Sequence, residues 1–129
     1  MEENNERMRK VREYENAKRA YYEDALKFMG EGDFRKASEL LWGAITIQVK
    51  LLALIKKGLH LGNHKQIRLF VQGVAKELQD EEIFKSFEFL ERLHVNFYDE
   101  IIEPNVFMFY AKEAAKFLKR LEDIMRMNT

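Results

Sequence analysis

One segment, residues 33–58, constrains the fold more than the rest of the chain because its apolar residues cover every side of a helix. Asp33 is a suitable N-cap, and Gly58 can adopt the left-handed conformation that ends helices. A helix that is apolar all round is buried. We therefore predict that it is the centre of a helical bundle and also part of a twofold homodimer interface. Its apolar residues are Leu40, Leu41, Trp42, Ala44, Ile45, Ile47, Val49, Leu51, Leu52, Leu54 and Ile55.

The remaining apolar residues recur at steps of three and four, which predicts helices over about residues 5–29, 65–79, 80–98 and from Pro104 onward. Asp80 is the expected cap of the fourth helix, and residues 60–64 are expected to form a loop. Short connections favour antiparallel neighbours. We predict an all-α fold: an antiparallel up-and-down bundle of about five helices in a single domain of residues 1–129. The expected core positions are Val11, Tyr14, Tyr21, Ala25 and Phe28; Ile67, Phe70, Val71, Val74 and Leu78; Ile83, Phe87, Leu90, His94 and Phe97; and Phe107, Tyr110, Ala114, Phe117, Leu118, Leu121 and Ile124.

The amino-acid composition excludes several classes of protein and of functional site. The chain has no cysteine, which excludes disulfides, a thiol nucleophile and cysteine-based metal sites. The longest apolar run, residues 40–49, is shorter than the ~20 residues of a membrane span, and the charged N-terminus does not resemble a signal peptide. We expect a cytoplasmic protein that does not enter a membrane.

The charges balance overall, with 22 basic and 22 acidic residues, but they are segregated along the chain. Residues 40–76 contain six basic and no acidic side chains, whereas residues 77–103 contain nine acidic and two basic ones. One interpretation is that neighbouring helices neutralise each other. The other is a basic end that attracts phosphate, formed by Lys56, Lys57, His60, His64 and Lys65.

Strict antiparallel packing would gather all three histidines and several other polar side chains at one end of the bundle, namely His60, His64, His94, Asn96, Tyr98, Asp99 and Glu103. His94 and His64 are the candidate catalytic pair there, since two imidazoles with a nearby carboxylate suffice for acid–base chemistry. The structural alternative makes His94 a hydrogen-bonded core residue and the other two histidines turn or capping residues. No metal and no cofactor is predicted. The binding candidates are Lys57, His60, His64, His94, Asn96 and Tyr98.

Three segments together resemble a known family. They are GDFRKASELLWGAITIQVKLLA (residues 32–53), the pair Asn63 and His64, and LERLHVNFYDE (residues 90–100) followed by Pro104. This pattern is similar to that of the archaeal PaREP family (type one), which is associated with the HEPN superfamily of helical domains. The resemblance implies a compact and commonly dimeric helical bundle from a thermophilic archaeon, in a family without a settled function. It places the family motif at Trp42, His64, His94, Asn96 and Tyr98.

Many HEPN proteins are metal-independent ribonucleases with an arginine followed by four to six residues and a histidine. This chain departs from that pattern, since Phe87, Glu88 and Phe89 stand where His94 would need an arginine. The leading hypothesis is therefore a non-catalytic binding or interaction protein that contacts RNA or a nucleotide near His64 and His94. The alternatives are a ribonuclease or phosphoester hydrolase that uses both histidines, and a structural partner-binding module of a toxin–antitoxin-like pair.

Overall fold

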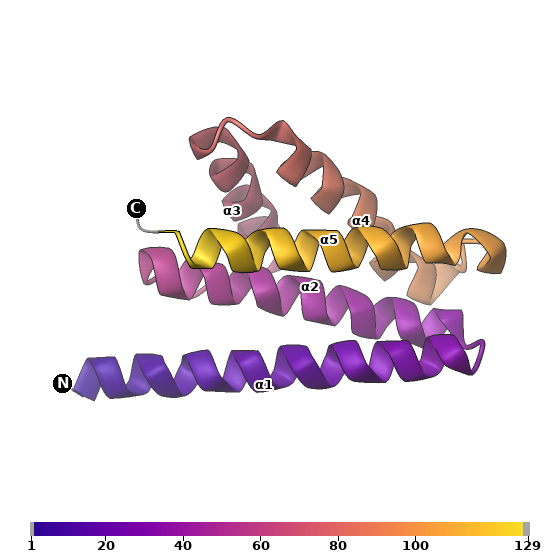
Figure 1. The fold of residues 1–129 in the computed structure, drawn as a ribbon, viewed down its shortest axis with the longest axis horizontal. Helices are drawn as coiled ribbons and strands as arrows, with labels where there is room; N and C mark the ends of the chain where they lie inside the picture. Colours follow the sequence, from indigo (N-terminus) through magenta and orange to yellow (C-terminus); the bar gives the residue numbers. More distant parts are fainter. Residues whose placement is uncertain (1, 128–129) are drawn as a thin grey trace.

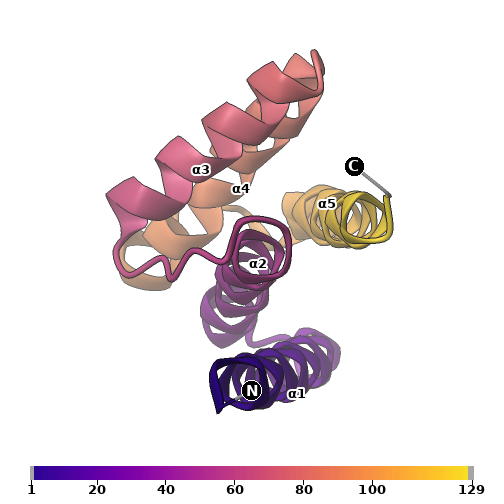
Figure 2. The same cartoon turned by 90° about the vertical axis from the view of Figure 1, so that its left-hand side faces the viewer.

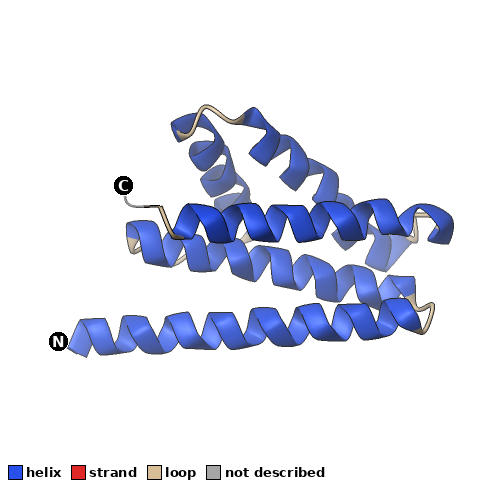
Figure 3. Ribbon diagram, viewed as in Figure 1, coloured by secondary structure: helices blue, strands red, loops and turns tan. Residues whose placement is uncertain are grey.

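The computed structural model describes residues 2–127, which form five α-helices and one short 3₁₀-helix. Within that range there is no strand (Figure 3). The predicted all-α bundle is thereby confirmed. The helices are α1 (Glu2–Gly30), α2 (Phe34–Lys57), α3 (His64–Glu77), α4 (Glu81–Asp99) and α5 (Phe107–Met125), with η1 (Pro104–Val106) before α5.

The helix boundaries follow from local capping chemistry. Asp33 accepts a hydrogen bond from the backbone N–H of Lys36 at 3.2 Å, and Gly58 ends α2 with φ 65° while its N–H bonds to the Leu54 carbonyl. Asn63 and Gln66 form a capping box in which each side chain bonds to the other residue's backbone N–H. This cap starts α3 at His64, one residue earlier than predicted.

Helix α2 is the centre of the bundle and contacts each of the other four α-helices. Helix α1 packs antiparallel along one side of α2, and α5 lies on another side and runs in the same direction as α2 (Figure 1). Helices α3 and α4 form a hairpin that is inclined to the other three and covers the remaining side (Figure 2). The central position predicted for the apolar helix is thus observed, and the homodimer remains a prediction.

The connection between α2 and α3 differs from the prediction. The α3 residue His64 lies beside Trp42, whereas Glu77 at the end of α3 pairs with Lys57 at the end of α2. Helix α3 therefore runs in the same sense as α2 rather than antiparallel to it. Trp42 and Lys57 are about 22 Å apart along the helix axis, and the six-residue connection 58–63 reaches about 20 Å when extended. The chain returns along α2 before α3 begins.

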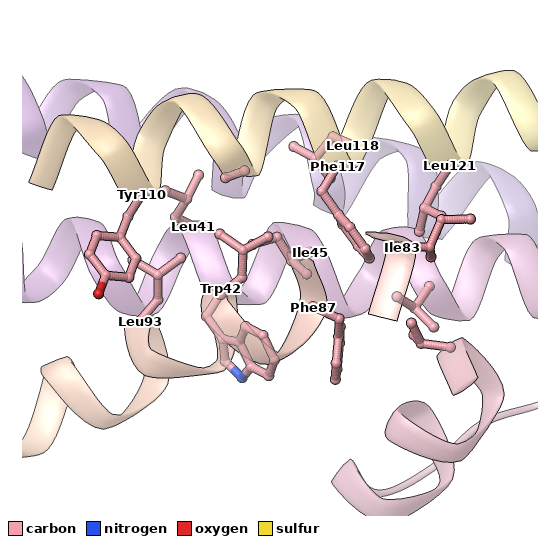
Figure 4. Packing of buried hydrophobic residues seen from close by; sticks show 14 of the residues in the cluster. Leu41, Trp42, Ile45, Ile83, Phe87, Leu93, Tyr110, Phe117, Leu118 and Leu121 are labelled. Carbon is pink, nitrogen blue, oxygen red and sulfur yellow. The ribbon is translucent and has the colours of Figure 1, made fainter. Parts of the chain in front are cut away.

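The core follows the predicted pattern closely in α5 and less closely in α4. All seven positions predicted for α5 are buried. In α4 the buried stripe continues from Leu90 to Leu93 and Asn96, so His94 and Phe97 are only partly buried. Rotating the stripe buries a leucine in place of an imidazole, which avoids the cost of desolvating a polar ring. Figure 4 shows Trp42 and Phe87 side by side at one margin of this core, with ring centroids 5.4 Å apart.

Helix α2 is the one helix of residues 2–127 that is long and apolar enough to cross a membrane. Most of its apolar segment is buried among the other helices, as in the core helix of a soluble protein. In contrast, α1 contacts mainly α2 and buries little: Ala25 is fully enclosed, whereas Tyr21, predicted to be in the core, is 41% exposed.

Candidate functional site

The indole of Trp42 is flanked by two of the three histidines. Its centroid lies 5.6 Å from the His64 ring and 6.2 Å from the His94 ring, with interplanar angles of 33° and 29°. Trp42 itself is 5% exposed and rests on Phe87. The side chains of His64 and His94 are 48% and 37% exposed. Three helices therefore bring both imidazoles to the surface above one buried indole.

Each imidazole is held by a carboxylate from another helix. His64 Nε2 lies 2.6 Å from Glu91 Oε2, and His94 Nδ1 lies 3.1 Å from Glu39 Oε2. An ionised carboxylate only accepts hydrogen bonds, so the ring nitrogen facing it carries the proton. In a neutral ring the second nitrogen, Nδ1 of His64 or Nε2 of His94, then keeps its lone pair and can accept a hydrogen bond from a ligand.

Tyr98 extends this surface along α4. Its ring stands edge-on to His94, with centroids 5.4 Å apart and an interplanar angle of 87°, and the residue is 63% exposed. An exposed aromatic ring beside a polar group is a common element of binding surfaces. We call the surface formed by Glu39, Trp42, His64, Glu91, His94 and Tyr98 the imidazole–tryptophan face.

Arg68 bridges α3 to α4 at the edge of this face. Its guanidinium contacts both Glu91 and Glu88, the latter at 2.8 Å. The hydrogen bonds that the guanidinium donates to Glu91 and Glu88 raise the pKa of Arg68 above its ordinary value. Lys57 pairs with Glu77 in the same way, at 3.3 Å. These contacts join the basic and the acidic segment of the chain, so for Arg68 and Lys57 the predicted neutralisation between neighbouring helices is observed.

Asn96 does not reach the imidazole–tryptophan face, because its side chain is buried and both of its polar atoms have hydrogen-bond partners in the interior. Nδ2 donates to Ser38 Oγ at 2.8 Å, and Oδ1 accepts from the backbone N–H of Ile102 at 2.6 Å. Ser38 in turn donates to the Phe34 carbonyl. This chain of bonds ties α4 and the segment after it to the start of α2, so Asn96 acts on the position of the α4–α5 connection.

His60 and Lys57 lie near the C-terminal end of α2, away from the other two histidines. His60 faces a cleft that is also lined by Arg7, Arg9 and Lys10 of α1. The single group predicted to contain all three histidines is therefore wrong, because the connection 58–63 carries His64 back along α2 and leaves His60 behind. Among the described residues, no group of three or more histidine, aspartate or glutamate side chains is arranged to hold a metal ion.

Comparison with known protein families matches residues 13–120 to the archaeal PaREP1/PaREP8 family. The chain belongs to this family. No curated protein and no solved structure matches it. The matched range contains the whole imidazole–tryptophan face of this PaREP1/PaREP8 protein and excludes Arg7, Arg9 and Lys10. A relation to the HEPN superfamily remains a prediction.

Sequence reasoning identified the imidazoles of this PaREP1/PaREP8 chain but missed the carboxylates that hold them. The signal was present in α4, where Glu91, His94 and Tyr98 stand at spacings of three and four and share one side of the helix. In α3, His64 and Arg68 are four residues apart and both reach Glu91. No helical spacing in the sequence indicates that Glu39 is the partner of His94, because the two residues are 55 positions apart.

We expect Asn96→Ala to destabilise the fold by about 1–3 kcal/mol, because it leaves the buried N–H of Ile102 without a partner. The matched control is Asn105→Ala, at an exposed position, for which a change within about 0.5 kcal/mol is expected. Urea unfolding followed by circular dichroism measures both. Equal stability of the two variants would show that the bond network around Asn96 does not support the α4–α5 connection.

Proposed function

We propose that this PaREP1/PaREP8 protein is a non-catalytic interaction protein that binds a partner polypeptide through the imidazole–tryptophan face. The observation that carries the proposal is the pair of exposed imidazoles above one indole, each held by a carboxylate through one ring nitrogen. Both imidazoles are open to solvent, with 48% and 37% of their side chains exposed, and five clefts among residues 2–127 are lined by side chains other than Trp42, His64 and His94. An open surface of this kind suits a protein partner better than a small substrate, which is usually held in a cleft.

Charge favours a basic partner at this face. Glu39 and Glu91 contact the imidazoles, and Arg68 is engaged by Glu91 and by Glu88. Carboxylates repel phosphate, so they argue against the RNA or nucleotide contact that the sequence suggested near His64 and His94. Arginine or lysine side chains of a partner could donate to the carboxylates and to the imidazole lone pairs. The proposal thus agrees with the partner-binding module considered from the sequence.

Trp42 is the only tryptophan of the chain, so its fluorescence reports on this face alone. We expect a peptide rich in arginine and lysine to change Trp42 emission saturably, and His94→Ala and Glu91→Gln each to weaken binding roughly tenfold, the effect of losing about 1.4 kcal/mol. His60→Ala is the matched control, because His60 lies outside the face. An acidic peptide of the same length should not bind.

Two results would contradict this assignment. One is an emission change that His60→Ala removes as effectively as His94→Ala. The other is saturable quenching of Trp42 by single-stranded RNA, lost in His94→Ala, which would make the face an RNA-binding surface. Circular dichroism of each variant separates loss of binding from loss of fold.

A second candidate function is phosphoester hydrolysis, and one observation favours it. A carboxylate on one ring nitrogen orients an imidazole as a general base, the arrangement used by many hydrolases. Both His64 and His94 have it. Against it stand the exposure of both imidazoles to solvent and the carboxylates beside them.

We expect the protein to cleave a labelled single-stranded RNA no faster than the double variant His64→Ala/His94→Ala does. The reason is that carboxylates beside the bases disfavour approach of the phosphate. Gel analysis of the products measures this difference. Cleavage by the wild type that either single alanine variant abolishes, with an unchanged melting temperature, would establish the hydrolase instead.

The predicted homodimer is also part of the proposal, but it does not use the middle of α2, which the other helices cover. Sedimentation equilibrium at several protein concentrations distinguishes one copy from two.

A further inference from the structure

A second surface, independent of the imidazole–tryptophan face, lies where α1 begins and α2 ends. Here a cleft is lined by Arg7, Arg9 and Lys10 from α1, by Leu54 from α2, and by Gly58 and His60 from the connection to α3. Asn4 and Glu6 complete its lining. Two segments that are separated by more than 40 residues in the sequence therefore line one concave site, and the α1 segment supplies its arginine and lysine side chains.

Arg7 builds the cleft and has its charge engaged by the backbone. Its Nη2 donates to the carbonyl of Leu54 at 2.5 Å and to that of Ile55 at 3.2 Å, so it satisfies the last turn of α2. Gly58 sits directly against the guanidinium, and a side chain on it would begin 3.6 Å from Nη2. By holding α1 against the end of α2, Arg7 positions the next turn of α1 at the cleft.

The other basic groups of the cleft are available to a ligand. Arg9 is exposed and makes no ion pair with any described residue. The Nζ of Lys10 makes a long contact of 3.6 Å to Glu13 and lies 4.9 Å from the centroid of the Tyr14 ring, and its side chain is 43% exposed. Lys56 in the last turn of α2 adds positive charge at the same end of the molecule, whereas the charge of Lys57 is paired with Glu77. Glu6 is the one acidic residue in the lining, so the cleft is basic overall.

We infer that this basic cleft binds a phosphate group, with Arg9 and Lys10 as the charged contacts and the His60 ring as a further polar contact. Guanidinium and ammonium groups are the usual protein partners of phosphate. Phosphate could come from a nucleic acid backbone or from a single nucleotide, and the chemistry of the cleft is the same for both. The site uses none of the residues of the imidazole–tryptophan face, so the failure of either proposal leaves the other standing.

The test is fluorescence anisotropy of a labelled single-stranded RNA decamer with the full chain, with a mononucleotide and inorganic phosphate as competitors. Neutralising two phosphates on a single strand gives a salt slope of about −1.4, hence roughly sevenfold weaker binding at about 200 mM than at about 50 mM salt. The variant Arg9→Gln/Lys10→Gln should remove most of this slope and of the affinity. It leaves Arg7 in place, so α1 stays attached to α2.

The matched control is Arg19→Gln/Lys27→Gln, which removes the same charge from exposed positions further along α1. It should bind RNA like the wild type. Competition by the mononucleotide that is lost in Arg9→Gln/Lys10→Gln would also support the cleft and would make a nucleotide its ligand. Equal weakening by the two double variants would overturn the inference, as would no binding of any of the three probes at low salt. Binding of a polyglutamate peptide without binding of RNA or nucleotide would overturn it as well, because the cleft would then accept a protein.

Discussion

Burial of α2 by the four helices around it is the constraint on which the rest of the structure depends. The helix has twelve buried residues, and each large aliphatic side chain that leaves water contributes about 1.5–3 kcal/mol to folding. Its neighbours therefore cover most of its apolar surface. α1 and α5 flank it along its length, which leaves the hairpin of α3 and α4 to cover the side that carries Trp42. The imidazole–tryptophan face forms because this hairpin packs over Trp42 and brings His64 and His94 to it.

The same constraint explains which predictions succeeded. In α5 the apolar residues define a single helical stripe, so the buried side of the helix is unambiguous and all seven predicted core positions are buried. In α4 two stripes were compatible with the sequence, and the one with Leu93 excludes His94 from the core. The direction of α3 could not be predicted from loop length alone, because a six-residue connection can either turn sharply or run back along the preceding helix. It runs back, and His64 and His94 meet at Trp42 while His60 remains near Gly58.

Polar groups divide the molecule into regions with different roles. Asn96 and Ser38 are buried and serve the fold, since their hydrogen bonds fasten the α4–α5 connection. His64 and His94 are exposed and held by carboxylates, which suits contact with a basic partner. The other end of α2 carries basic side chains around His60, which suits phosphate. The range that matches the PaREP1/PaREP8 family, residues 13–120, contains the first two regions. It begins after the basic residues Arg7, Arg9 and Lys10 of α1.

The most direct test of this account is whether both His64 and His94 touch the single tryptophan in solution. The ring centroids lie 5.6 Å and 6.2 Å from Trp42, so ring protons approach more closely than that. Nuclear Overhauser effects measured on the full chain, with the histidines assigned by single substitution, should connect the Trp42 indole to His64 and to His94 and not to His60. An indole with no connection to His64, or with one to His60, would contradict the return of the chain along α2 and the candidate face built upon it.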